Sequence, residues 1–257
     1  MALTGERTVP GVAEENYWFR RHEVVYRRLL DQFADRFADA EVLEAGCGEG
    51  YGADLIAGVA RRVIGLDYDE YAVAHVRARY PRVDMRHGNL ADLPLPDESV
   101  DIVVNFQVIE HLWNQGQFVA ECRRVLRPGG LLLMSTPNRI TFTPGSDTPV
   151  NPFHTRELNA AEMTELLTDA GLLVDGLYGV YHGARLRDID ARHGGSIIDA
   201  QITRALADAP WPADLLADIA SITIDDFDIV PDSVTDTDGD SRPIDDSLDL
   251  VAIAVRP

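Results

Sequence analysis

The sequence predicts an α/β fold, a Rossmann-like, doubly wound and mostly parallel sheet that ends in a C-terminal antiparallel hairpin. Three observations carry this prediction. The run VLEAGCGEGYG at 42–52 has the pattern of a strand, a glycine turn and the start of a helix. An acidic residue, Asp67, closes the next apolar run about 20 residues later, as in a nucleotide-binding βαβ unit. The runs ITIDDFDIV and LDLVAIAV then stand as a strand pair at the end of a chain that otherwise alternates strands and helices.

The chain is expected to form one domain. Its 257 residues and hydrophobic content of 46% suffice for a single substantial core. We divide it into an N-terminal lid segment (1–37), a cofactor-binding core (38–138), substrate-binding loops with an insertion (139–222) and the closing hairpin (223–257).

The net charge and the two cysteines exclude several classes of function. The formal net charge of −20 would repel a polyanion, which argues against nucleic acid as substrate and against an anionic membrane surface. The two cysteines, Cys47 and Cys122, lack metal-ligand spacing, and no run resembles an export signal or a bilayer span. We therefore expect a soluble, cytoplasmic protein that acts on a small molecule. Its oligomeric state stays open, with a homodimer among the alternatives.

The glycine turn indicates the class of cofactor. Gly46 and Gly48 let the backbone turn sharply and approach a ligand closely, and Asp67 can accept both hydroxyls of a ribose. No Lys-Ser or Lys-Thr pair follows the glycines, so a triphosphate cradle is not expected. Glu44 would repel a pyrophosphate but attract the ammonium group of an amino acid. These features favour S-adenosylmethionine.

Two alternatives to this interpretation of the turn remain open. Gly48, Gly50 and Ala53 also satisfy the GxGxxA form of the dinucleotide fingerprint, which would make the chain a dehydrogenase. Glycine-rich strand-to-helix turns also occur without any cofactor.

The elements after Asp67 follow one order. They are a helical stretch (DEYAVAHVRARY), a short strand reaching GNLADLPLPDESVD, an apolar strand with its turn (IVVNFQVIEHL), an amphipathic helix (FVAECRRVLRPGG) and a strand (LLLMSTPN). This order, together with EAGCGEG, NLADLP, QVIEHL and LRPGG, resembles the class I S-adenosylmethionine-dependent methyltransferases over residues 38–138.

The resemblance implies a set of cofactor residues. Glu44, Gly46 and Gly48 would line the methionine part, Asp67 would bind the ribose, and Asn89 with Leu90 would bind the adenine. Asn89 replaces the Asp that is more frequent in the family, and its amide can still hydrogen-bond an adenine edge. Tyr68 and Gln107 complete the expected set within this core.

The N-terminal segment GERTVPGVAEENYWFRRHEVVYRRLL is interpreted as a lid. Its aromatic residues would exclude water from the sulfonium, and Tyr17 or Arg21 would bind the methionine carboxylate. The alternative is an amphipathic helix that packs on the sheet edge and leaves its arginines solvated.

Two histidines are candidate catalytic residues. His154, in the turn-rich loop TPNRITFTPGSDTPVNPFHTREL, lies just before a helix that Thr155 can cap, and His111 follows the apolar strand at the same edge of the sheet. A sugar hydroxyl is a weak acid, so its methylation calls for a base or a metal ion. Structural roles for both histidines are the alternative.

The sequence also suggests a metal site. Glu110, His111 and His154 resemble part of the metal-binding motif of small-RNA 2′-O-methyltransferases. Gln107 stands where that motif has a glutamate, so the resemblance implies a weak, water-rich Mg²⁺ site. A core role for Glu110 is the alternative.

The insertion VYHGARLRDIDARHGGSIIDAQITRALADAPWP is the candidate acceptor site. Polar side chains interleaved with aromatic rings suit a carbohydrate. The expected substrate residues are Tyr181, His182, Arg185, Asp190 and His193. A helix with solvated charges is the alternative.

At the scale of the whole chain the resemblance becomes narrower. ENYWFRRH, EAGCGEGYGADLIA, VNFQVIEHLW, VNPFHTREL and DARHGGSIIDAQI are similar to the mycobacterial sugar 1-O-methyltransferases of methylmannose polysaccharide biosynthesis. The resemblance implies methylation of the anomeric hydroxyl of a short, partly methylated mannoside. Methylation of a quinone or small phenol, and non-catalytic binding of S-adenosylmethionine, are the two other functions that the sequence leaves open.

Overall fold

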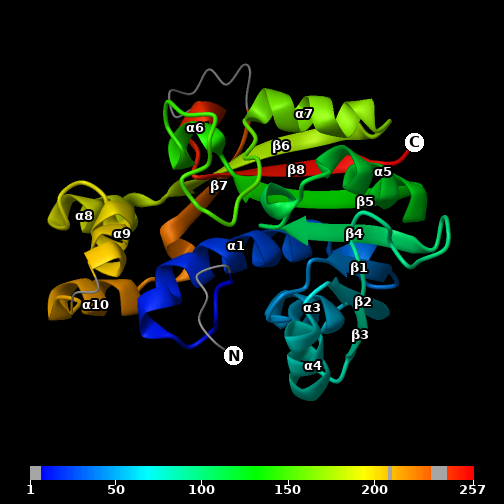
Figure 1. Ribbon diagram of the computed structural model, residues 1–257, viewed down its shortest axis with the longest axis horizontal. Helices are drawn as coiled ribbons and strands as arrows, with labels where there is room; N and C mark the ends of the chain where they lie inside the picture. The colour runs from blue at the N-terminus through cyan, green and yellow to red at the C-terminus, as the bar shows by residue number, and fades with distance from the viewer. Residues whose placement is uncertain (1–6, 208–209, 233–241) are drawn as a thin grey trace.

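The structure is a computed structural model that describes residues 7–207, 210–232 and 242–257. In this part of the chain, eight strands form one sheet in the order β3-β2-β1-β4-β5-β8-β6-β7 (Figure 1). The strands are β1 (Glu41–Ala45), β2 (Arg62–Asp67), β3 (Val83–His87), β4 (Val100–Phe106), β5 (Leu126–Pro137), β6 (Leu173–His182), β7 (Phe227–Pro231) and β8 (Asp249–Val255). β1 to β5 pair in parallel, whereas β6, β7 and β8 pair antiparallel to their neighbours. The predicted doubly wound, mostly parallel fold is therefore confirmed.

Helices cover both faces of the sheet. The α-helices are α1 (Asn16–Gln32), α2 (Ala34–Phe37), α3 (Tyr51–Ala57), α4 (Glu70–Arg79), α5 (Gln115–Val125), α6 (Arg139–Phe142), α7 (Ala160–Asp169), α8 (Ala184–Arg192), α9 (Ile197–Ala207) and α10 (Ala213–Ala220). Short 3-10 turns are η1 (Ala13–Glu15), η2 (Ile109–His111), η3 (Ile224–Asp226) and η4 (Ile244–Asp246). Figure 1 shows α8, α9 and α10 grouped at one end of the molecule. None of the helices described has the length and apolar composition needed to cross a bilayer.

Two apolar cores result from the alternation of side chains along each strand. On β1, Val42 belongs to the core beneath α1, α3 and α4, and its neighbour Leu43 belongs to the core beneath α5 and α7. Both faces of the central strands are therefore buried, which explains why these strands are almost continuously apolar.

The closing strands differ from the sequence prediction in one respect. The two C-terminal runs do form strands, β7 and β8, but they do not pair with each other, because β6 lies between them. Burial explains the arrangement: six of the seven residues of β8 are buried, so this strand takes an interior position between β5 and β6. β7 is only partly buried and forms the edge, where a less apolar strand is tolerated.

The N-terminal segment folds into a helix that packs into the protein. α1 buries Tyr17, Val24, Val25 and Leu29 in the core that it shares with α3. The packing agrees with the alternative interpretation of the segment as an amphipathic helix, but the expectation that its arginines are solvated is wrong for Arg21, which is 2% exposed. A closing motion of the segment stays a prediction.

A buried ion pair ties α1 to the start of β8. The Arg21 guanidinium donates to both carboxylate oxygens of Asp249 at 2.6 Å and to the carbonyl of Leu248 at 2.8 Å. The side chains of Arg21 and Asp249 are 2% and 0% exposed. An ion pair this deep is costly to break, because either partner alone would be an uncompensated buried charge.

Replacing one partner of this pair should strongly destabilise the protein. We expect R21A to lower the free energy of unfolding by about 3–5 kcal/mol, measured by urea denaturation. The control is R27A, because the Arg27 side chain is 48% exposed and pairs with Glu23 on the helix surface. R27A should lower the free energy of unfolding by about 0.5 kcal/mol or less. Equal unfolding midpoints for the two variants would contradict the structural role assigned to Arg21.

Candidate active site

The expected cofactor residues gather at one edge of the sheet. The glycine turn follows β1, Asp67 ends β2, Asn89 follows β3 and Gln107 follows β4. The strand order reverses between β1 and β4, and in such sheets ligands bind beyond the carboxyl ends of the strands at the reversal. The structure thus brings together residues that lie far apart in the sequence.

The glycine turn is fastened to β2. The backbone N–H groups of Gly46 and Cys47 donate to the carbonyl of Leu66, at 2.8 and 2.9 Å. Gly46 has φ +85°, and a Cβ there would come within 2.6 Å of Val108. This position therefore requires glycine for both its conformation and its space.

Asp67 links the second strand to the turn. Its Oδ2 accepts from the N–H of Gly48 at 2.8 Å and its Oδ1 accepts from the N–H of Asp69 at 3.0 Å. Each carboxylate oxygen has a second lone pair, so the buried carboxylate is held in place with capacity for ligand hydroxyls.

Glu44 is a buried carboxyl group with one unused oxygen. Oε1 accepts a hydrogen bond from the Tyr26 hydroxyl at 2.7 Å, whereas Oε2 is buried and has no partner among the described residues. Burial raises the pKa of Glu44 to about 7. A buried acceptor left unpaired is costly, so this oxygen fits a site that receives a cationic or donor group from a ligand.

Arg7 covers the turn, which the sequence did not indicate. One guanidinium nitrogen lies 2.8 Å from Asp69 Oδ2 and another lies 3.8 Å from Asp67 Oδ1. The Arg7 Cδ lies 3.7 Å from the position that a Cβ on Gly48 would take. No motif in the sequence links Arg7 to this site, because the contact depends on how residues before α1 lie over the sheet edge.

The other expected cofactor residues vary in exposure. Tyr68 is 66% exposed, Asn89 is exposed and Leu90 is buried. Gln107 has φ +57°, a left-handed conformation that is rare for residues other than glycine, and its N–H donates to the carbonyl of Ser135. Strained backbone of this kind clusters at functional sites. The roles of these residues stay predictions.

The side chains of Tyr17 and Arg21 both contact other side chains of the protein. The Tyr17 hydroxyl lies 2.7 Å from His182 Nε2, and Arg21 forms the ion pair with Asp249. A contact of either residue with the methionine carboxylate would require these bonds to open, so that assignment stays a prediction.

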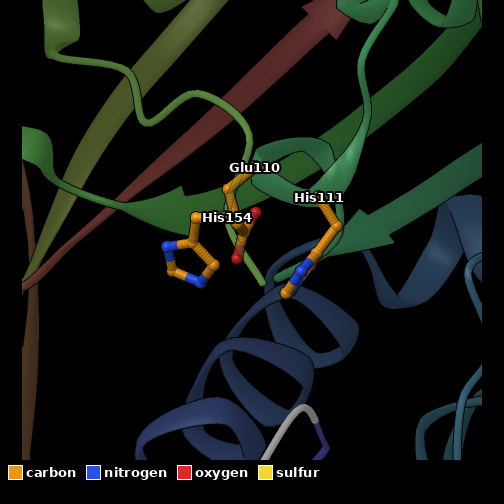
Figure 2. A group of neighbouring side chains, drawn as sticks. All are labelled: Glu110, His111 and His154. Carbon is orange, nitrogen blue, oxygen red and sulfur yellow. The ribbon is translucent and has the colours of Figure 1, made fainter. Parts of the chain in front are cut away.

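Glu110, His111 and His154 form a cluster. Each offers a ligand atom, and these atoms lie within 4.8 Å of one another. Figure 2 shows the His154 ring beside the Glu110 carboxyl group, with His111 on the other side. Thr155 holds the two chain segments together, because its N–H donates to the carbonyl of Glu110 at 2.7 Å and its hydroxyl donates to the carbonyl of Leu112 at 2.8 Å.

Thr155 does not cap the following helix, contrary to the sequence prediction. α7 begins later, and Asn159 caps it in a capping box with Glu162. Thr155 instead satisfies backbone carbonyls of η2 and the residue after it, which positions His154 beside His111.

Burial controls the charge of the cluster. Burial raises the pKa of Glu110 to about 8, and the Thr136 hydroxyl donates to its Oε2 at 3.0 Å. Burial also lowers the pKa of His111 to about 4. Near neutral pH the cluster therefore holds a largely protonated Glu110 and a neutral His111.

His154 has partners that the sequence analysis missed. Its Nδ1 lies 2.6 Å from Glu157 Oε1 and its Nε2 lies 3.0 Å from Asn151 Nδ2. The ring packs against Phe142 at a centroid distance of 5.3 Å. In the sequence, Glu157 stands out only because it follows His154 by three residues in HTRE. Polar residues at this spacing are common, so the contact could not be predicted without the fold.

The expected acceptor residues pair with protein groups. Tyr181 donates to the carbonyl of Pro243 at 2.9 Å, and His182 Nδ1 lies 2.6 Å from Asp190 Oδ2. Arg185 and His193 contact Asp226 and Asp218 at 2.6 and 2.8 Å. The insertion is thus a set of helices linked by polar pairs, and contact of these residues with an acceptor stays a prediction.

Comparison with known proteins agrees with the geometry. The family described as "Methyltransferase domain" matches residues 43–134. The chain is 73% identical over 257 residues to a probable S-adenosylmethionine-dependent methyltransferase of Mycolicibacterium smegmatis, covering 100% of this chain and 96% of that protein. A similarly described protein of Mycobacterium tuberculosis is 67% identical, with 100% and 90% covered. A solved methyltransferase structure from Thermotoga maritima superposes with a TM-score of 0.61 at 17% identity, covering 93% of each chain.

The family match at residues 43–134 includes the glycine turn, the acid that ends β2 and Glu44. It also decides against the dehydrogenase alternative. The chain belongs to the class I S-adenosylmethionine-dependent methyltransferases, and S-adenosylmethionine is its cofactor.

Proposed function

We propose that this enzyme is an O-methyltransferase that methylates the anomeric hydroxyl of a short, partly methylated mannoside. The observation that carries O-methylation is the pair of histidines, His111 and His154, next to a buried carboxyl group at the cofactor edge of the sheet. A sugar hydroxyl must lose a proton during transfer, and an imidazole within this cluster can accept it. The choice of a mannoside rests on the whole-chain resemblance to sugar 1-O-methyltransferases.

The protein must orient two reactants and remove a proton. The cofactor supplies an electrophilic methyl group on a sulfonium, and attack by the acceptor oxygen is an in-line displacement. We infer that Asp67 binds the ribose hydroxyls and that Glu44 meets the ammonium group. Holding the acceptor oxygen near this methyl group accounts for a large part of the rate enhancement, because orientation alone can contribute about 7–11 kcal/mol.

Exposed aromatic side chains near the histidines support a sugar acceptor. Trp113 follows His111 by two residues and is 91% exposed, and Phe153, whose carbonyl contacts His111, is 42% exposed. Exposed rings can cover the C–H faces of a sugar, whereas a quinone acceptor calls for a more enclosed apolar cavity.

We also propose a weak divalent-cation site at Glu110, His111 and His154. One carboxylate and two imidazoles are a donor set that a divalent ion can use, provided that Glu110 is deprotonated. With few oxygen donors, Mg²⁺ would retain several waters. A bound ion would occupy imidazole nitrogens that otherwise could accept the proton, and it would instead lower the pKa of a coordinated hydroxyl.

The acceptor can be identified with a labelled methyl donor. We expect transfer to mannosides that have a free anomeric hydroxyl and none to the same mannosides with that hydroxyl already methylated. The H154A variant is the control for background transfer. Label found in a phenol or quinone precursor but not in any mannoside would contradict the proposal, and absence of transfer to every acceptor would favour a non-catalytic cofactor-binding protein.

Cofactor affinity should depend on pH through Glu44. Its pKa of about 7 means that near neutral pH about half of the unliganded protein carries this group protonated. The ligand ammonium favours the carboxylate, so affinity should rise from pH 5.5 to 8, by at most about tenfold per pH unit below 7. Calorimetry with S-adenosylhomocysteine in buffers of different ionisation enthalpy should detect proton release.

The E44Q variant should lose this pH dependence, and E41Q, on the same strand, should keep it. An affinity of the native protein that is constant from pH 5.5 to 8 would show that Glu44 does not meet the ammonium group.

The metal proposal predicts that turnover needs a divalent cation. Excess EDTA should abolish most activity, and added Mg²⁺ should restore it. Mn²⁺ binding, followed by electron paramagnetic resonance, should strengthen from pH 6 to 8 as Glu110 loses its proton, because its pKa is about 8. E110Q should weaken binding at least about tenfold, and the surface variant E98Q should not. Full activity in excess EDTA would reject the metal site.

A further inference from the structure

The side chain of Arg7 lies in front of the cofactor edge of the sheet. We propose that Arg7 is an intramolecular competitor of the cofactor: its guanidinium group lies on the side of Asp67 that receives the ribose hydroxyls, and it has to leave when the cofactor enters. This inference rests on the assignment of Asp67 to the ribose. It does not depend on the acceptor, because it concerns only the affinity for the cofactor.

Arg7 approaches both the end of β2 and the glycine turn. One guanidinium nitrogen donates to Asp69 Oδ2 at 2.8 Å, and another lies 3.8 Å from Asp67 Oδ1. The Arg7 side chain is only 15% exposed, so it lies against the protein and does not extend into solvent. The structure therefore places a cation directly beside the carboxylate that is expected to bind the ribose.

The aliphatic part of Arg7 covers the surface that Gly48 leaves open. The Arg7 Cδ and Nε atoms lie 3.7 and 3.9 Å from the point where a Cβ on Gly48 would stand, which is van der Waals contact. Glycines in such a turn allow a ligand to approach the backbone closely. Arg7 thus lies over the same backbone surface that the turn offers to the cofactor.

Asp67 has limited capacity for additional hydrogen bonds. Its two oxygens already accept from the N–H groups of Gly48 and Asp69, which leaves one lone pair on each oxygen. A ribose that donates both hydroxyls would use both of them. A hydroxyl oxygen placed between Oδ1 and the guanidinium nitrogen needs about 2.7 Å to each atom. A separation of 3.8 Å does not provide this along the line of approach, so the guanidinium group has to move.

The segment that carries Arg7 can move at a modest cost. None of residues 7–15 is buried. Polar contacts hold the backbone next to Arg7: the Thr8 hydroxyl lies 3.4 Å from His22 Nδ1, and the Val9 N–H donates to Glu15 Oε2 at 2.7 Å. Segments with few buried apolar contacts are the ones that open most readily. Displacement of Arg7 therefore does not require the core to unfold.

Asp69 anchors Arg7 and also caps the next helix. Its Oδ2 accepts from Arg7, whereas its Oδ1 accepts from the N–H of Tyr71 at the start of α4. The hydrogen bond from Arg7 holds the pKa of Asp69 below its usual range. An ion pair of this kind near the surface is weak enough to open when a ligand competes.

The test is the binding of S-adenosylhomocysteine, which requires no turnover. In calorimetry, R7A should bind this ligand about twofold to fivefold more tightly than the native protein, because no competing contact has to open. In stopped-flow experiments the gain should appear in the association rate, with the dissociation rate unchanged. The control is R82A, which removes an ion pair of equal length, Arg82 to Asp54 at 2.8 Å, at the opposite edge of the sheet. R82A should bind like the native protein.

The D69N variant tests whether Asp69 is the anchor. Asparagine caps helices about as well as aspartate, so D69N should keep the cap of α4 and weaken only the contact with Arg7. D69N should therefore raise the affinity in the native background and leave the affinity of R7A unchanged. A further gain from D69N in the R7A background would contradict the anchoring role.

The possible failures can be told apart. Unchanged or weaker binding in R7A would overturn the inference, and faster dissociation from R7A would show that Arg7 contacts the bound cofactor instead of competing with it. D67N should weaken binding at least about tenfold. Native affinity in D67N would reject the ribose assignment and the inference with it. Failure of every mannoside as acceptor would overturn the proposed function and leave these binding results unaffected.

Discussion

The parallel pairing of β1 with both β2 and β4 is the constraint on which the site depends. Because β1 pairs on both sides, the carboxyl ends of three strands meet where the chain reverses its order. The glycine turn and Asp67 then face each other, and a hydrogen bond from Gly48 to Asp67 joins them. η2, which carries Glu110 and His111, follows β4 at the same edge. The candidate cofactor residues and the histidine cluster are therefore brought together by backbone pairing rather than by a separate domain.

Desolvation of acids gives the site its chemical character. The chain carries a net charge of −20, yet Glu44, Glu110 and Glu157 are all buried. A buried carboxylate is stable only if it is protonated or meets a partner. Glu44 and Glu110 have raised pKa values, whereas Glu157 has His154 at 2.6 Å. Three buried residues of the same type thus differ in their contacts, which the local surroundings decide.

Features that depend on short sequence motifs could be predicted from the sequence. Contacts between residues far apart in the chain could not. The glycine turn, Asp67 and the succession of strands and helices in the core follow from short motifs, and the proximity of His111 and His154 follows from their places after strands at one edge. The pairing of β8 with β5 and β6 could not be predicted from its own residues, because it depends on which strand is most apolar along its length. The ion pairs of Arg7 and Arg21 could not be predicted from the sequence for a similar reason: their partners lie 62 and 228 residues away.

The two histidines show that equal residue types at one edge of the sheet can have different surroundings. Both are placed by the same loop, since Phe153 contacts His111 through its carbonyl and Asn151 through its N–H. The Nδ1 of His111 lies 3.0 Å from the carbonyl oxygen of Phe153, whereas the Nδ1 of His154 lies 2.6 Å from a carboxylate oxygen of Glu157, so the two rings differ in what they contact. A sequence gives two equal candidates at this edge. The difference between them is a single carboxylate three residues after His154, held beside the ring by the backbone bridge between Leu158 and Asn138.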